Sequence, residues 1–410
     1  MIVNDTDLLN AAAEFYESLH ESKNVKDNDI AAYLRMTPIV NKLSKKEKES
    51  IEGKITESEC NKAMKQLKMN KSPGLDGIPG EFYQKFWDRI SKVIIGSFNE
   101  SFDEGQLSDT KRSAVISLIF KKGDARLLCN YRPISLTNCD YKILAFCLAN
   151  RIQSVIKTIV HPSQVAYIHE RYIGSNIRIV EDMIEFCNQH DKKGILMMLD
   201  FQKAFDSLEW NFLYAVLKKF NFGEMFINWI KTLYENPETC IKNNGHLSRS
   251  ISLERGVRQG CPVSALLFII ALEVLSVNIR NDPNLKGLSL YKKNVKVLQY
   301  ADDGVLFLED KNELHVALGI VKEFGNLAGT CLNQSKCEGL WLGRDKHRQS
   351  KCNIGGIKWP TEPIRCLGIY IGHNKVKQDE LNWYKKIDRI KLLLESFFFF
   401  VKSFYLHITV

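Results

Sequence analysis

The 410-residue sequence lacks the features that mark several large classes of protein. Its eleven cysteines include no Cys-x-x-Cys pair, which argues against a disulfide framework and against a zinc knuckle. Its nine histidines show no His-x-x-x-His spacing, so we assign them no metal-binding role. The first ten residues contain no apolar run, and no signal peptide is expected. The longest apolar helix-like run, Val263–Val277, contains Glu273 and is too short to span a bilayer, so no membrane partner is expected.

The composition is that of an ordinary globular protein, with 45% hydrophobic and 26% charged residues. The length allows one large domain or two to three ordinary ones. The net charge of +9 suits an anionic partner such as a nucleic acid, although many basic proteins bind none. Scattered cysteines favour a reducing, intracellular compartment, and the sequence does not distinguish nucleus from cytoplasm.

The hydrophobic pattern mixes helices with antiparallel hairpins, which predicts an α+β fold rather than a doubly wound sheet. Residues 1–55 are a polar, helical or loosely ordered lead-in, and Thr56 and Glu59 form a capping box that begins a helix. Further helices are expected at 79–102, 141–160, 175–189, 207–235, from 262, and at 311–328. Strands are expected at 115–120, 194–199, on both sides of 243–245, and at 295–301, 305–308, 337–342 and 364–371.

Acidic side chains stand where predicted strands end. The apolar run 194–199 leads into Asp200, and Asp302 and Asp303 lie in a hairpin whose turn is predicted at Asp303–Gly304. A carboxylate at the end of a buried strand must be hydrated, paired or metal-bound. Carboxylates suit Mg²⁺, and two such ions can hold the attacking and leaving oxygens of a phosphoryl transfer. The alternative is an exposed Asp-Asp-Gly turn that holds no metal.

Three motifs follow one another in a specific order. Leu199–Asp206 reads Leu-Asp-Phe-Gln-Lys-Ala-Phe-Asp, Arg255–Pro262 reads Arg-Gly-Val-Arg-Gln-Gly-Cys-Pro, and Gln299–Asp303 reads Gln-Tyr-Ala-Asp-Asp. In these motifs the chain resembles the reverse transcriptases, specifically those of non-LTR (LINE-type) retrotransposons. Further elements that resemble this family, over about residues 56–390, are Ser72–Pro79, Ile119–Asp124, Asn130–Leu136, Gly329, Asn333, Lys336 and Leu367–Gly372.

The resemblance implies a right-hand polymerase with fingers and palm, an antiparallel palm sheet packed on helices, and an incomplete thumb. The expected domains are a lead-in at 1–55, an N-terminal finger extension at 56–110, a reverse transcriptase domain at 103–372 and a thumb remnant at 373–410. Phe120 and Ala265 replace prolines that are frequent in the family. After Leu394 the run Phe397–Lys402 departs from the thumb pattern, which suggests a truncated or frame-shifted fragment without the endonuclease and Cys/His segments of a parent polyprotein.

The resemblance also implies a catalytic set. Asp200 and Asp302 would bind two Mg²⁺ ions, with Mn²⁺ as an alternative, and Asp303 would be a weaker or shared ligand. The Phe201 carbonyl would reach one metal. Lys336 would protonate the leaving pyrophosphate, although an ordinary surface lysine fits that position nearly as well.

The nucleotide-binding set is implied in the same way. Lys122 and Arg132 would hold the triphosphate, and Gln259 and Gly260 would line the nucleotide pocket. Phe205 would lie under the sugar as a steric gate against a 2′-hydroxyl. The alternatives are solvated surface charges for the two cations and a plain core aromatic for Phe205.

These observations predict an RNA-directed DNA polymerase that uses an RNA template, a DNA primer and deoxynucleoside triphosphates. The competing prediction is an inactive remnant that retains nucleic-acid binding, which primer extension compared with salt-sensitive binding would distinguish. An intron-encoded maturase would carry a basic C-terminal RNA-binding extension, and the sequence has none.

Overall fold

The computed structural model describes residues 5–347, 356–360, 363–384 and 386–396. The fold is a mixture of helices and several sheets, as the predicted α+β class requires, and it is about half helical. The chain divides into two compact units. The first comprises residues 1–171, 201–285 and 315–332, and the second comprises 172–200, 286–314 and 333–410. The expected run Phe397–Lys402 lies outside the described residues.

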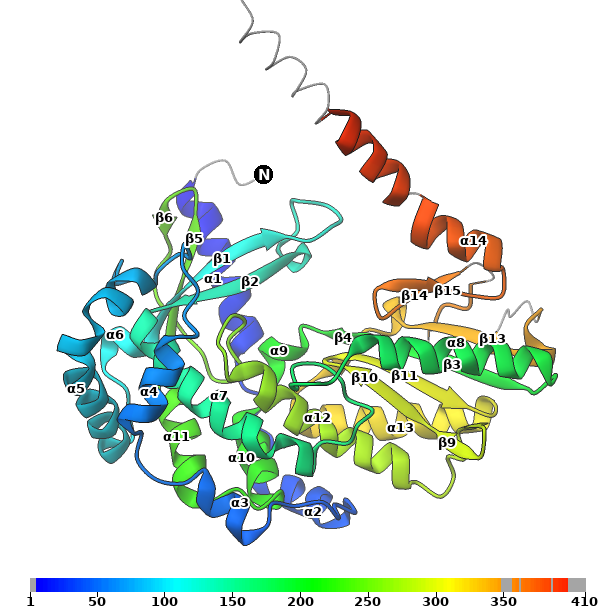
Figure 1. Ribbon diagram of the computed structural model, residues 1–410, viewed down its shortest axis with the longest axis horizontal. Helices are drawn as coiled ribbons and strands as arrows, with labels where there is room; N and C mark the ends of the chain where they lie inside the picture. Colours follow the sequence, from blue (N-terminus) through cyan, green and yellow to red (C-terminus); the bar gives the residue numbers. More distant parts are fainter. Residues whose placement is uncertain (1–4, 348–355, 361–362, 385, 397–410) are drawn as a thin grey trace, which may run out of the picture. The chain divides into compact units, whose positions relative to one another are not determined.

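The first unit is mainly helical (Figure 1). Its helices are α1 (Asp5–His20), α2 (Asp27–Met36), α3 (Lys45–Ser50), α4 (Glu57–Met64), α5 (Gly80–Glu104), α6 (Asp109–Arg112), α7 (Cys139–Ile159), α9 (Ala204–Ser207), α10 (Trp210–Lys219), α11 (Glu224–Tyr234), α12 (Ser264–Asn281), most of α13 (Lys311–Ala328), and the short 3₁₀ turn η1 (Leu128–Asn130). Its strands are β1 (Ser113–Phe120), β2 (Tyr131–Thr137), β4 (Phe201–Gln202), β5 (Glu238–Asn243), β6 (His246–Leu247), β7 (Ile251–Ser252) and β12 (Cys331–Leu332).

The main sheet of the first unit has the order β2-β1-β5-β6, with β7 also paired to β5. β1 runs antiparallel to β2 and parallel to β5. Helix α1 packs on this sheet through Ala12, Ala13 and Tyr16, which are buried against Ile116 and Ile241. The described part of the polar lead-in is therefore mainly helical, and its helix α1 has core contacts of its own.

The second unit carries a four-stranded antiparallel sheet with helix α8 lying along it (Figure 1). The elements of this unit are α8 (Ile173–Gln189), β3 (Gly194–Leu199), β8 (Leu288–Leu290), β9 (Lys293–Val295), β10 (Val297–Tyr300), β11 (Asp303–Leu308), η2 (Gln334–Lys336), β13 (Glu338–Leu342), η3 (Gly343–Asp345), β14 (Ile364–Cys366), β15 (Ile369–Ile371), α14 (Lys375–Asp379) and η4 (Glu380–Tyr384). The strand order is β10-β11-β3-β13, and the α8 residues Val180, Met183 and Cys187 share one buried cluster with Leu196 and Phe307 of the sheet.

Several predicted elements are confirmed in detail. Thr56 and Glu59 form the capping box of α4, β3 covers 194–199, and α13 covers 311–328. The predicted helical stretch at 207–235 is occupied by two helices, α10 and α11. The predicted strand at 364–371 is instead a hairpin, because Leu367 and Gly368 adopt positive φ angles of 48° and 89° and reverse the chain between β14 and β15.

Helix α12 is the one described helix that is long and apolar enough, by length and composition, to cross a membrane. Most of it is buried inside the first unit. Buried core helices also have this length and composition, so these two properties do not identify α12 as a membrane-spanning helix.

Candidate active site

The three predicted metal-binding aspartates stand at one end of the sheet in the second unit. β3 ends at Leu199, which pairs with Gly304 of β11, so Asp200 comes level with Asp303 in the antiparallel register. Asp302 occupies the turn that joins β10 to β11. Asp200 and Asp302 are half-buried and Asp303 is exposed. The sheet therefore gathers the three residues that the sequence placed at separate strand ends.

The hairpin turn differs from the prediction. Tyr300 pairs with Asp303, so the two turn residues are Ala301 and Asp302, and the predicted turn residues Asp303 and Gly304 lie in β11. Ala301 takes the positive φ of 55° that the turn requires. Gly304 serves close packing, since a Cβ atom there would stand 3.2 Å from Cδ1 of Leu199. A non-glycine residue with positive φ costs about 1–2 kcal/mol, and such strain is typical of functional turns.

The backbone of Asp200 is fixed from both sides. Its N–H donates to Sγ of Cys337 at 3.4 Å, and its carbonyl accepts from the N–H of Asn333 at 2.7 Å. Burial raises the pKa of the Cys337 thiol to about 11, and burial together with the charge of Asp303 raises the pKa of the Cys366 thiol to about 12. Both thiols stay protonated at neutral pH, which leaves carboxylates as the anionic ligands of this region.

Among the described residues, no group of three or more His, Cys, Asp or Glu side chains is already arranged to enclose a metal ion. Mg²⁺ does not need such a cage, because it keeps several waters and uses one or two protein carboxylates together with substrate phosphates. The aspartates at this sheet end therefore fit Mg²⁺ in donor type and in register.

Lys336 also belongs to the second unit. It is exposed on the short 3₁₀ turn η2, where its N–H donates to the carbonyl of Asn333, the residue bonded to the Asp200 backbone. The chain thus brings Lys336 to the neighbourhood of Asp200. No described contact of the ammonium group assigns it a role in proton transfer.

The six residues of the predicted nucleotide-binding set lie in the first unit. Lys122 is exposed in the loop between β1 and β2, and Arg132 is exposed on β2 opposite Ile119. Phe201 is buried in β4 and pairs with Leu332. Phe205 is half-buried and stacks on Phe268, with ring centroids 4.4 Å apart.

The turn that contains Gln259 and Gly260 is held against α9 and β2. The N–H of Val257 donates to the carbonyl of Phe205 at 2.7 Å, and the N–H of Ser135 donates to the carbonyl of Gln259 at 2.8 Å. Gly256 has a φ of 90°, and a Cβ there would stand 2.5 Å from the carbonyl oxygen of Asp206. This glycine is therefore required both for its conformation and for close packing.

Asp206 is a functional candidate that the sequence did not single out. Its carboxylate is buried and accepts hydrogen bonds from Nε2 of Gln259 at 3.0 and 3.1 Å. Burial raises the pKa of Asp206 to about 7, against the opposing effects of the Lys203 charge and the Gln259 hydrogen bond. Asp206 occurs in the motif Leu199–Asp206, but its burial depends on the later turn that covers it, which local sequence does not encode.

A small cavity of about 10 Å³ lies beneath this turn. Its polar lining includes His20, Asp206, Arg255, Arg258 and Gln259. Arg258 is buried, stacks over Tyr141 at 5.2 Å and donates through Nη2 to the carbonyl of Arg112. Within the described part of the chain its Nε and Nη1 groups have no hydrogen-bond partner. The turn therefore rests on a polar interior rather than on a purely apolar core.

Comparisons with known proteins identify the family of the chain. The family model of reverse transcriptase (RNA-dependent DNA polymerase) matches residues 119–371. The chain is 33% identical over 362 residues to the transposon TX1 uncharacterized 149 kDa protein of Xenopus laevis, a match that covers 88% of this chain and 27% of that protein. It is 27% identical to the Pol polyprotein of the type-2 retrotransposable element R2DM of Drosophila melanogaster, over 80% of this chain and 29% of that protein.

A third relative is the probable RNA-directed DNA polymerase from transposon BS of Drosophila melanogaster, 23% identical over 68% of this chain and 30% of that protein. The chain thus spans less than a third of the length of each of these curated relatives. The family model covers more than half of the chain, and its match contains all three aspartates. The chain therefore belongs to the reverse transcriptase family and is related to the Pol proteins of non-LTR retrotransposons.

Proposed function

We propose that the chain is an RNA-directed DNA polymerase that extends a DNA primer on an RNA template with deoxynucleoside triphosphates. The observation that carries the proposal is the meeting of Asp200 with Asp302 and Asp303 at one end of the antiparallel sheet. In this proposal the sheet β10-β11-β3-β13 belongs to the palm of a right-hand polymerase, and the β1–β2 hairpin belongs to the fingers. Residues 373–410 would belong to the thumb.

The aspartates supply the negative charge that such a reaction needs. Asp200 and Asp302 would each hold a divalent ion, and Asp303 would be the weaker or shared ligand. When bound, two Mg²⁺ ions supply Lewis-acid stabilisation to the attacking and leaving oxygens of the phosphoryl transfer. The hydrogen bonds on both sides of the Asp200 backbone support this role, because they fix the direction from which the carboxylate projects. The Phe201 carbonyl would be a further ligand.

The other roles are proposed from the resemblance of the motifs that contain these residues. Lys122 and Arg132 would bind the triphosphate, and their exposure supports this because substrate must reach them. Gln259 and Gly260 would contact the nucleotide through a turn whose backbone is already hydrogen-bonded. Phe205 would exclude the 2′-hydroxyl, and Lys336 would protonate the leaving pyrophosphate. An RNA–DNA hybrid would be recognised through its shape and backbone.

Primer extension tests the proposal. The protein is supplied with poly(rA)/oligo(dT), dTTP and Mg²⁺, and a parallel reaction contains excess chelator. The proposal predicts extension that requires both the template and the divalent ion. Salt-sensitive binding of the hybrid by the folded protein without any extension would instead identify an inactive nucleic-acid-binding remnant.

A further inference from the structure

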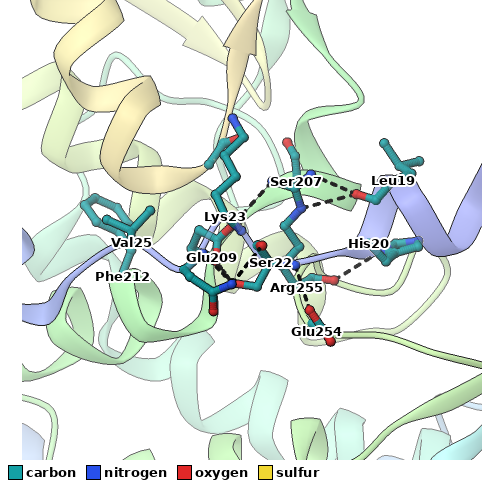
Figure 2. A network of polar contacts seen from close by, with 12 residues as sticks. Leu19, His20, Ser22, Lys23, Val25, Ser207, Glu209, Phe212, Glu254 and Arg255 are labelled. Atoms are coloured by element: carbon teal, nitrogen blue, oxygen red, sulfur yellow. Dashed lines mark hydrogen bonds and ion pairs between the residues drawn. The ribbon is translucent and has the colours of Figure 1, made fainter.

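The segment Leu19–Val25 connects α1 to α2 and crosses the residues that support the Arg255–Gly260 turn (Figure 2). It lies outside the residues matched by the family model. Its contacts join three parts of the first unit that are distant in sequence: Glu209, the pair Glu254–Arg255, and Gly329.

Glu209 is the centre of these contacts. Its side chain is 2% exposed and accepts from Oγ of Ser22 at 2.7 Å, from the N–H of Lys23 at 3.0 Å and from Nη1 of Arg255 at 3.3 Å. Figure 2 shows these three residues converging on Glu209. A buried carboxylate that loses such donors is strongly destabilised, so Ser22 and Lys23 stabilise the ion pair of Glu209 with Arg255.

The segment also holds Arg255 directly. The Arg255 guanidinium donates to the carbonyl of Leu19 from Nε at 3.2 Å and from Nη2 at 3.0 Å, and the Arg255 carbonyl accepts from Nδ1 of His20 at 3.1 Å. Burial lowers the pKa of His20 to about 4, so this ring is neutral at physiological pH and Nδ1–H is the donor. Next to Arg255, the N–H of Glu254 donates to the carbonyl of His20 at 3.1 Å, while its carboxylate accepts from the N–H of Ser22 at 2.9 Å.

We propose that Leu19–Lys23 is a positioning element for the nucleotide-binding turn, acting through Glu209 and Arg255 to hold the backbone that presents Gln259. The geometry supports this because Arg255 directly precedes Gly256, whose N–H donates to the carbonyl of Leu208 at 2.8 Å, next to Glu209. Lys23 extends the element by donating from Nζ to the carbonyl of Gly329 at 2.9 Å. Residues outside the stretch matched by the family model thus tune nucleotide affinity, an inference that rests on the proposed polymerase function.

The test uses Ser22→Ala and Lys23→Ala, singly and together, in the full chain. Ser18→Ala and Lys26→Ala are matched controls, because both side chains are exposed on either side of the segment. Amide hydrogen exchange over residues 253–260 reports the turn without requiring activity. Nucleotide KM and kcat in primer extension report the functional consequence, and Ser22→Thr restores the hydroxyl donor.

The proposal predicts that Ser22→Ala and the double variant exchange residues 253–260 about tenfold faster, as expected when the buried Glu209 carboxylate loses the Ser22 hydroxyl donor. It predicts a similar rise in the nucleotide KM with little change in kcat, wild-type behaviour of both controls, and rescue by Ser22→Thr. Unchanged exchange over 253–260 would overturn it, as would faster exchange with an unchanged KM. If the double variant does not fold, the single Ser22→Ala change decides in the same way, because it removes the hydroxyl donor to Glu209. A wild-type chain without extension would count against the polymerase function, while the exchange result would still decide whether the segment holds the turn.

Discussion

Asp206 shows how one buried charge can couple the stability of the protein to pH. Its carboxyl group is fully enclosed and accepts hydrogen bonds from the Gln259 amide. Among the residues that the structure describes, no hydrogen-bonded cation offsets the cost of burying its negative charge. Because its pKa is raised from 3.8 to about 7, Asp206 favours folding below pH 4, and this contribution is lost as the pH rises through 7. The same carboxylate fixes the amide of Gln259, which links stability to the nucleotide pocket.

Replacing Asp206 with Asn should therefore stabilise the protein at high pH and not at low pH. Asn keeps a hydrogen-bond partner for Gln259 and removes the buried charge, so the gain at pH 8 should approach an upper limit of about 4 kcal/mol and should vanish near pH 4. Urea unfolding followed by circular dichroism at both pH values measures it. Asp88→Asn, on the exposed face of α5, is the control, and an equal gain at both pH values would refute the account.

Substitution of Phe205 distinguishes its two proposed roles, a steric gate against ribonucleotides and a plain core aromatic. If the half-buried ring contacts the sugar, Phe205→Ala should raise the use of ribonucleotides relative to deoxynucleotides by as much as about 100-fold, the scale on which a pocket senses one hydroxyl. Competitive incorporation of CTP and dCTP measures the ratio. Phe82→Ala, an exposed aromatic on α5, should leave the ratio unchanged. A loss of stability without a change in the ratio would make Phe205 only the stacking partner of Phe268.

At the scale of elements, Arg151 joins α7 to α4 and to the segment that precedes α4. Its buried guanidinium donates to both carboxylate oxygens of Glu59, at 2.6 and 3.0 Å, and to the carbonyls of Ile51, Gly53 and Lys54. Glu59 also completes the capping box of α4. One side chain thus joins two helices through a set of fixed donor directions.

Arg151→Met should lower the free energy of unfolding by about 3–5 kcal/mol, because Glu59 and three carbonyls lose their donors in a buried site. Arg151→Lys should recover only part of the loss, since an ammonium group cannot reproduce the fork of a guanidinium. Chemical denaturation measures both variants. The control is Lys157→Met on the same helix, where an exposed ion pair with Glu170 should contribute at most about 1 kcal/mol. Equal losses for Arg151→Met and Lys157→Met would contradict this reading.

The predictability of an element depended on whether its determinants are local. α13 and β3 were predicted with their observed bounds because hydrophobic periodicity and run length determine them. The hairpin turn was misplaced by two residues, because Asp303–Gly304 is a common turn pair while here Gly304 lies within β11 and packs closely against Leu199. The segment Leu19–Val25 carried no sequence signal, since its hydrogen bonds reach residues about 190 to 300 positions away, as for Lys23 with Glu209 and Gly329.

At the scale of the whole molecule, the chain distributes its candidate residues over two units. The second unit contains Asp200, Asp302, Asp303 and Lys336, and the first contains the nucleotide-binding set. The boundary falls between Asp200 and Phe201, inside a single sequence motif. The motif order therefore identified the family, whereas the buried partners Asp206 and Glu209 became visible only when distant segments were brought together.

The central claim is that the aspartates at the end of the β3–β11 sheet carry the catalysis. The most direct measurement compares primer extension on poly(rA)/oligo(dT) by wild type, Asp302→Ala and the exposed control Asp88→Ala, with hybrid binding measured in parallel. Loss of a metal ligand should lower the rate of Asp302→Ala at least about 1,000-fold, equivalent to several kcal/mol of lost stabilisation, and should leave binding and the control unchanged. Equal extension by wild type and Asp302→Ala would contradict the account.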